Sequence, residues 1–128
     1  MSLVLVDTSV WRRHFSGKLT AQHARWLSDL LDEDGAVLAH PWVIGELVLG
    51  GLAAEQEALL RWIPSATEVA DSDLLGFIRH RRLSQRGIGW VDAQLLACAL
   101  THSVQLWAID RALEAVAEEL NVKFQGFQ

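Results

Sequence analysis

The sequence has a single cysteine, only two prolines and no long uncharged apolar stretch. Because Cys98 has no second cysteine to pair with, a scaffold stapled by internal disulfides is excluded, and we expect a reducing, cytoplasmic location. No segment approaches the roughly 18 uncharged apolar residues that a membrane-spanning helix needs. The apolar run 3–6 has no basic flank and meets Asp7 at once, so we expect neither a signal peptide nor membrane attachment.

An excess of positive charge is also missing. The chain carries 11 Lys and Arg against 16 Asp and Glu, which gives a formal net charge of −5. A protein that coats nucleic acid normally has the opposite balance, so that class is disfavoured. The sequence also lacks the Cys and His spacing of a zinc site and the glycine-rich lysine loop of a nucleotide-binding site. These absences still allow an enzyme that gathers acidic residues around metal ions.

The pattern of apolar residues predicts one α/β domain over residues 1–128, of which 51% are hydrophobic. Short apolar runs alternate with longer helical patterns, which favours a mostly parallel sheet with right-handed crossovers. The predicted strands are 3–6, 36–39, 66–69, 104–109 and 122–124. The predicted helices are 20–31, 41–49, 53–62, 71–83, 90–100 and 110–120.

Four of the acidic residues occupy unusual places. Asp7 and Asp110 directly follow predicted strands, while Asp92 lies in the first turn of an apolar helix and Glu46 lies in an apolar helical run. Taken singly, each aspartate is explained as a helix cap or as a complement to the helix dipole. Taken together they indicate a site, because ligands of open parallel sheets bind beyond the C-terminal ends of the strands.

A cluster of carboxylates is electrostatically costly without a cation, since neighbouring negative charges raise one another's pKa. Such a cluster is expected either to share protons or to hold a hard divalent cation. Oxygen-only ligands favour Mg²⁺ or Mn²⁺ among the common protein metals.

Each of the four acids lies in a distinctive segment. In chain order the segments are VDTSVW at 6–11, PWVIGEL at 41–47, GIGWVDAQLL at 87–96 and LWAIDR at 106–111. In this order they resemble the motifs of PIN-domain ribonucleases, especially the VapC toxins of bacterial VapBC toxin–antitoxin systems. The resemblance covers essentially the whole chain. One departure is Ala108, where these toxins often have threonine, so that a hydroxyl group near Asp110 is missing.

The resemblance implies a three-layer α/β fold in which helices flank a mostly parallel central sheet of order 3-2-1-4-5. It also implies a ribonuclease that depends on Mg²⁺ or Mn²⁺, with Asp7, Glu46, Asp92 and Asp110 as catalytic residues. Asp7 and Asp92 would be the principal metal ligands. Glu46 and Asp110 would act as further ligands or orient the attacking water. The implied partners are an RNA substrate and a small VapB-type antitoxin.

Six tryptophans are many for a chain of this length. Trp26 and Trp62 are expected in the core. Trp11, Trp42 and Trp90 lie close in sequence to the acids, where each either packs in the core, stacks on a base or accepts a partner.

Two other features also allow more than one interpretation, and a third predicts an assembly. Ser9 either hydrogen-bonds a ligand carboxylate or caps the helix that follows it. The basic segment 79–86 either contacts RNA phosphates or an acidic partner, or is a solvated helix end. The apolar helical stretches 43–52 and 74–83 offer more apolar surface than one buried face needs, so we expect a homodimer.

Three rival functions come from other classes. A PIN-like module that only docks RNA or protein would not need all four acids. A nuclease specific for DNA structures shares the carboxylate chemistry, but the chain has no inserted region to grip DNA. A phosphatase-like α/β protein is disfavoured because Ser9 stands where such enzymes place a second aspartate.

Overall fold

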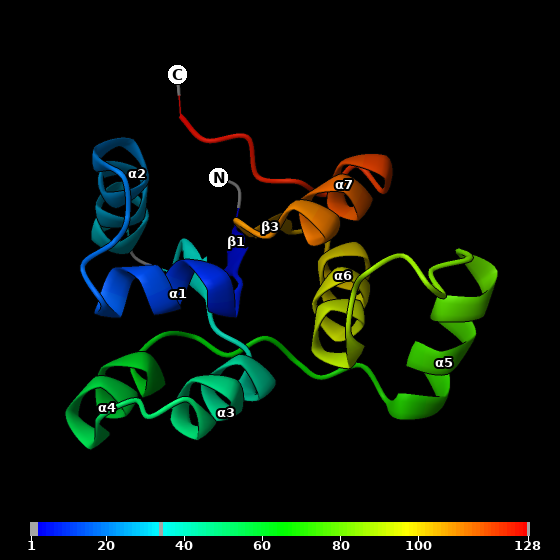
Figure 1. The fold of residues 1–128 in the computed structure, drawn as a ribbon, viewed down its shortest axis with the longest axis horizontal. Coiled ribbons are helices and arrows are strands. Elements are labelled where there is room, and N and C mark those ends of the chain that lie inside the picture. The colour runs from blue at the N-terminus through cyan, green and yellow to red at the C-terminus, as the bar shows by residue number, and fades with distance from the viewer. Residues whose placement is uncertain (1–2, 34, 128) are drawn as a thin grey trace.

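The fold is seen in a computed structural model that describes residues 3–33 and 35–127. Its sheet has three parallel strands, β1 (Val4–Val6), β2 (Val37–Leu38) and β3 (Gln105–Trp107), in the order β2-β1-β3. Helices surround the sheet (Figure 1). They are α1 (Thr8–Phe15), α2 (Ala21–Asp32), α3 (Pro41–Leu49), α4 (Ala54–Arg61), α5 (Asp71–His80), α6 (Trp90–His102) and α7 (Arg111–Glu119).

The central strand β1 is buried along its whole length, as its unbroken apolar sequence predicts. Figure 1 shows α1 and α2 on one side of the sheet and α6 and α7 on the other, with α5 outermost. Helix α1 packs against α3, and α5 packs against α6. The predicted architecture, a parallel sheet flanked by helices, is confirmed. None of the helices in the described ranges has both the length and the apolar character needed to cross a membrane.

Two further segments extend the sheet by single parallel bridges. Ala39, just beyond β2, pairs with Ser65, and Leu106 of β3 pairs with Lys123. With these bridges the five segments follow the predicted order 3-2-1-4-5. The segments 66–69 and 122–124 are nevertheless not strands, so their prediction as strands is wrong.

At the end of the segment 66–69, a side chain takes the place of a strand partner for Val69. The buried Gln94 of α6 accepts a hydrogen bond from the Val69 N–H at 2.7 Å and donates one to the Val69 carbonyl at 3.0 Å. Buried backbone groups must find partners, and here one amide side chain provides both. The Ala66 N–H still donates to the Ala39 carbonyl at 2.7 Å, so the segment is held beside β2 at its start and by α6 at its end.

The helices begin where the sequence places capping residues. Thr20 caps α2 by accepting a hydrogen bond from the His23 N–H at 3.1 Å. Pro41 occupies the start of α3, and the buried His40 caps that helix because its Nδ1 accepts the Trp42 N–H at 3.0 Å. Helix α1 received no predicted range, since it has only eight residues and begins immediately after β1.

Candidate carboxylate site

Two carboxylates stand at the C-terminal ends of neighbouring strands. Asp7 follows β1 and is the N-cap of α1, while Asp110 follows β3 and is the N-cap of α7. The Asp7 N–H donates to the Trp107 carbonyl at 2.9 Å, which ties the two strand ends together. Both acids therefore lie where the sheet order reverses, the usual position of a ligand site in an open α/β sheet.

Two helices bring the other carboxylates to the same place. Glu46 projects from α3, and the Thr8 hydroxyl donates to its Oε1 at 2.6 Å. Asp92 lies in the first turn of α6 and accepts a hydrogen bond from the Gly89 N–H at 2.9 Å. The charges of the three other acids all raise the pKa of Asp92, so each of them lies within electrostatic range of Asp92.

Burial raises the pKa of both Asp7 and Asp92 above the ordinary value for aspartate. Asp7 is only 4% exposed, and its desolvation outweighs the two hydrogen bonds from Ser9, which act in the opposite direction. At Asp92, burial likewise outweighs the hydrogen bond from Gly89. Repulsion from the neighbouring carboxylates adds to the pKa of each. The chain thus holds ionisable groups where their charged forms need compensation.

Three helix N-termini supply part of that compensation. Helices α1, α6 and α7 each begin beside one of the aspartates. The N-terminal end of a helix carries a partial positive charge and unpaired N–H groups, which stabilise carboxylates and also attract phosphate. The helix-cap and functional interpretations of Asp7 and Asp110 are therefore compatible, because the caps lie in the site.

Ser9 joins the two strand ends at this site. Its hydroxyl donates to Asp7 Oδ2 at 2.6 Å and accepts the Ile109 N–H at 3.0 Å, while its own N–H donates to the same Oδ2 at 3.0 Å. Of the two interpretations from the sequence, the structure shows the hydrogen bond to a carboxylate, and the cap of α1 is Asp7 itself. The contact with Ile109 also holds the backbone beside Ala108, which has no hydroxyl to do so.

Ser9→Ala is expected to lower the free energy of unfolding by about 1–3 kcal/mol, because the partly buried Ile109 N–H and Asp7 carboxylate each lose a partner. Urea denaturation measures this change. Ser16→Ala is the matched control: the Ser16 hydroxyl bonds only exposed carbonyls at the other end of α1, so a change within about 0.5 kcal/mol is expected. Equal changes in the free energy of unfolding for the two variants would show that the Ser9 hydrogen bonds do not stabilise the contact between the two strand ends.

Thr8 is a site residue that sequence reasoning missed. Its hydroxyl fixes Glu46 across 38 positions of sequence, and the Thr8 side chain is buried. The only sequence signal for a role of Thr8 in the site is its position directly after Asp7. A hydroxyl residue is common at the start of a helix, so this position does not predict the bond to Glu46. Its partner therefore had to come from the folded chain.

The tryptophans differ widely in exposure. Trp11 is buried with 2% exposure, Trp42 is half-buried, and Trp90 is 45% exposed beside Asp92 in sequence. Trp26 is partly buried against the core. Trp62, at the end of α4, is 87% exposed, so its predicted place in the core is wrong. Helix α4 turns its apolar Leu60 inward, and Trp62 lies beyond the last helical turn.

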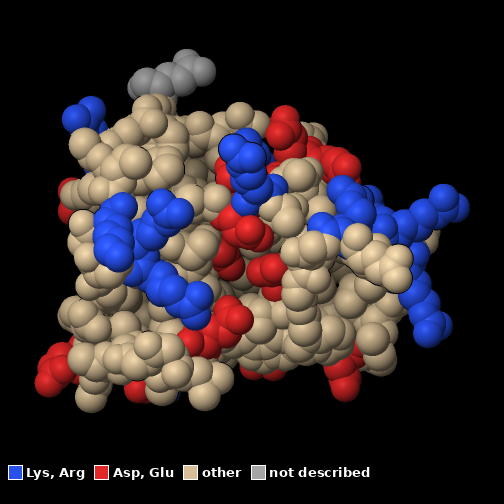
Figure 2. All heavy atoms as spheres, viewed as in Figure 1, with Lys and Arg blue, Asp and Glu red and all other residues tan. Residues whose placement is uncertain are grey.

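The arginines of the basic segment 79–86 differ in their contacts. Arg86 binds Glu119 of α7 through Nη2 at 2.9 and 3.0 Å. Within the part of the chain that is described, Arg79, Arg81 and Arg82 form no ion pair. Figure 2 shows acidic side chains near the middle of one face, with basic side chains to either side.

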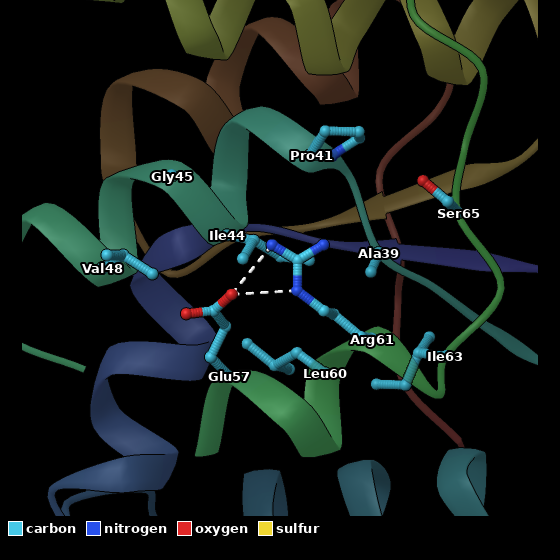
Figure 3. Close-up of a pocket in the computed structure, with 10 residues that line it drawn as sticks. All are labelled: Ala39, Pro41, Ile44, Gly45, Val48, Glu57, Leu60, Arg61, Ile63 and Ser65. Carbon is cyan, nitrogen blue, oxygen red and sulfur yellow. Dashed lines mark hydrogen bonds and ion pairs between the residues drawn. The ribbon is translucent and has the colours of Figure 1, made fainter. Parts of the chain in front are cut away.

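A pocket of about 400 Å³ lies away from the four acids, between α3 and α4 (Figure 3). Its wall includes Ile44, Val48 and Leu60, and the ion pair of Arg61 with Glu57 at 2.8 Å lies at its side. None of the four site carboxylates lines it. This pocket therefore takes no part in the carboxylate chemistry.

The site presents only oxygen donors to a cation. Between residues 3 and 127, leaving out 34, no three His, Cys, Asp or Glu side chains stand close enough to form a ready-made metal centre. Mg²⁺ does not need one, because it keeps several waters and is commonly bound by one or two carboxylates. Two partly desolvated aspartates with raised pKa values, Asp7 and Asp92, fit that requirement.

Known proteins resemble the chain in sequence and in fold. A family model described as PIN domain matches residues 4–119. The protein named Ribonuclease VapC32, from Mycobacterium tuberculosis strain H37Rv, is 39% identical over 124 residues, which cover 94% of each chain. Among solved structures, FitAcB from Neisseria gonorrhoeae has a TM-score of 0.63 at 20% identity and covers 91% of this chain and 94% of that one. PAE2754 from Pyrobaculum aerophilum has a TM-score of 0.57 at 14% identity, covering 89% and 84%.

Proposed function

The chain belongs to the PIN domain family, and we propose that it is a metal-dependent endoribonuclease, the toxin of a type II toxin–antitoxin pair. The single observation that carries the proposal is the convergence of Asp7, Glu46, Asp92 and Asp110 on one end of the sheet. The relative named as a ribonuclease supports RNA as the substrate class. The chain would act in the cytoplasm.

Asp7 and Asp92 are the proposed ligands of Mg²⁺ or Mn²⁺. When bound, such an ion lowers the pKa of its water and neutralises charge on a phosphate. Glu46, fixed by the Thr8 hydroxyl, and Asp110, fixed by its cap hydrogen bond from the Leu113 N–H at 3.3 Å, act as further ligands or orient the attacking water. The helix N-termini beside the aspartates favour the phosphodiester group itself.

The test is a panel of single-stranded RNA, single-stranded and flap DNA, and a phosphomonoester, each incubated with and without Mg²⁺. We expect cleavage of RNA alone, and only with the metal. Cleavage of the DNA substrates instead would indicate a DNA structure-specific nuclease. RNA binding without any cleavage would indicate a binding module, and release of phosphate from the monoester a phosphatase.

We also infer a VapB-type antitoxin as partner, with its C-terminal segment covering the carboxylate site. The acidic surface suits an arginine of the partner, and the half-buried Trp42 beside it suits an apolar anchor. Trp11 does not contribute, because it is buried. Co-expression with a candidate antitoxin is expected to give a stable complex without ribonuclease activity. A complex that still cleaves RNA would contradict covering of the site.

A homodimer is the second assembly that we propose. Leu49 of α3 is 90% exposed, and Leu75 of α5 is also exposed, so both apolar helical stretches present side chains to the surface. Burying such side chains against a second copy would stabilise the assembly. Sedimentation of the isolated chain at micromolar concentration is expected to show a dimer, and a monomer would contradict it.

A further inference from the structure

Two tryptophans form a stacked pair between the helices that carry Glu46 and Asp92. The rings of Trp42 and Trp90 have centroids 6.0 Å apart and planes inclined by 23°. Trp42 lies four residues before Glu46 in α3, hence on the same side of the helix. Trp90 directly follows Gly89, whose N–H donates to Asp92 at 2.9 Å. The pair therefore comes from the same two helices that carry two of the acids.

One ring of the pair is packed against the protein, and the other is partly exposed to solvent. Trp42 packs against a small buried cluster of Leu74, Ala93 and Ala97, between α5 and α6. Its backbone N–H is bound by the buried His40. Trp90 leaves 45% of its surface exposed. Because the Trp90 ring already stacks on the packed Trp42 ring, it loses little conformational freedom when a base stacks on it.

A small pocket continues from Trp90 toward the end of α5. Its volume is about 170 Å³, and Ile78 and Leu83 line it together with Trp90. Ser84 and Gln85, both exposed, add polar groups to its wall. Apolar and aromatic surfaces with a few polar side chains are what proteins use to hold a single unpaired base.

Charge favours an uncharged contact at this place. Four carboxylates and a net charge of −5 oppose a purely electrostatic grip on RNA. Stacking on the face of a base adds affinity without bringing a phosphate nearer to the acids. Arg79, Arg81 and Arg82, at the end of α5, have no ion pair with any described residue and can meet the phosphates that follow such a base.

We propose that Trp42 and Trp90, with the adjoining pocket, form a nucleobase subsite in which the base of a nucleotide next to the scissile phosphate stacks on the Trp90 indole. This proposal rests on the proposed cleavage of RNA, and it specifies which residues bind a base of the substrate. Exposure of a tryptophan alone does not identify a base-binding site. Trp62 is more exposed, but among the described residues it has no aromatic partner.

The kinetic test uses a short single-stranded RNA that the protein cleaves, with one nucleotide at a time replaced by an abasic residue. At one position beside the cleavage site, loss of the base is expected to lower kcat/KM roughly 5- to 150-fold, the range of one base–aromatic stack. Trp90→Ala is expected to lower kcat/KM similarly on the intact RNA and to be insensitive to the abasic residue at that position. Trp90→Phe should keep most of the activity.

Trp62→Ala is the matched control, because it removes an exposed indole away from the pair, and it should leave kcat/KM and the abasic profile unchanged. If Trp90→Ala loses the same factor on intact and abasic RNA, the side chain has only a structural role and the subsite is wrong. Unchanged kinetics in Trp90→Ala would also overturn the subsite, and would leave the pair as a surface for a protein partner.

A binding measurement separates this proposal from the proposed activity. Fluorescence anisotropy with a labelled single-stranded RNA in the presence of a chelator needs no cleavage. Trp90→Ala is expected to weaken binding, whereas Trp62→Ala is not. If the wild-type protein cleaves no RNA, the proposed function fails, and the anisotropy comparison still decides the subsite. Equal affinities of both variants and the wild type would overturn it.

Discussion

Asp7→Asn is expected to lower the rate of RNA cleavage by about 100-fold or more while the chain remains folded. Asparagine caps a helix as well as aspartate does, so α1 keeps its start. The amide nevertheless lacks the negative charge that would bind a cation beside the phosphate. Losses of this size follow when one preorganised electrostatic group is removed from an active site. Single-turnover cleavage with Mg²⁺ measures the effect.

The control for this variant is Asp29→Asn, which makes the same chemical change on the exposed side of α2 and should leave the rate unchanged. An Asp7→Asn protein that cleaves RNA like the wild type would exclude Asp7 as a ligand.

Stability and pH give Asp7→Asn a second signature. Burial raises the pKa of Asp7 in the folded metal-free chain, so this carboxyl favours folding below its ordinary pKa. That contribution is lost as the pH rises through the raised value. Asparagine does not titrate, so the metal-free variant should gain stability relative to the wild type as the pH rises from acid to neutral. Thermal melts at several pH values with a chelator measure the difference; a difference independent of pH would contradict the buried carboxylate.

Removal of divalent metal is expected to lower RNA cleavage by about 1,000-fold or more, because the ion is worth several kcal/mol of charge stabilisation at a phosphate. Mg²⁺ or Mn²⁺ added back should restore it. The measurement is cleavage after treatment with a chelator, with circular dichroism as the control that the metal-free chain is folded. Undiminished cleavage in the chelator would exclude a metal-dependent reaction.

Acidification should weaken the metal site. Protonation of Asp7 and Asp92 would remove the proposed ligands, and their raised pKa values place this loss at a higher pH than for exposed aspartates. Titration of Mg²⁺ at several pH values is expected to show an affinity that falls as the solution is acidified. Equal affinities in acid and at neutral pH would show that other groups bind the ion.

Local chemistry made much of the fold predictable. The apolar run before Asp7 could only be a buried strand, and Thr20 and Pro41 marked helix starts through capping and fixed backbone geometry. The edge segments were less predictable, because an apolar sequence does not say whether its backbone pairs with a strand or a side chain. Val69 pairs with Gln94, a contact across 25 positions. Trp62 was misplaced because helical spacing does not reveal where the last turn ends.

The candidate site was predictable at the level of residues and not of contacts. The position of Asp7 and Asp110 after strands was visible in the sequence, since parallel strands end at one edge of a sheet. The bonds from Thr8 to Glu46 and from Ser9 to Ile109 were not, because each joins elements that only the folded chain brings together. The stack of Trp90 on Trp42 likewise joins α6 to α3, which only the folded chain brings together.

The hydrogen bond between Ser9 and Ile109 has a consequence for the protein during its synthesis. The two residues are 100 positions apart. One edge of β1 has no strand partner until β3 has been synthesised. At typical translation rates, roughly 5 to 20 s separate the appearance of these two ends. A nascent chain on the ribosome therefore contains Asp7 long before it contains Asp110 or the third strand of the sheet. The proposed activity should therefore begin only after Asp110 and β3 have emerged, and a chain terminated before Asp110 is expected not to cleave RNA.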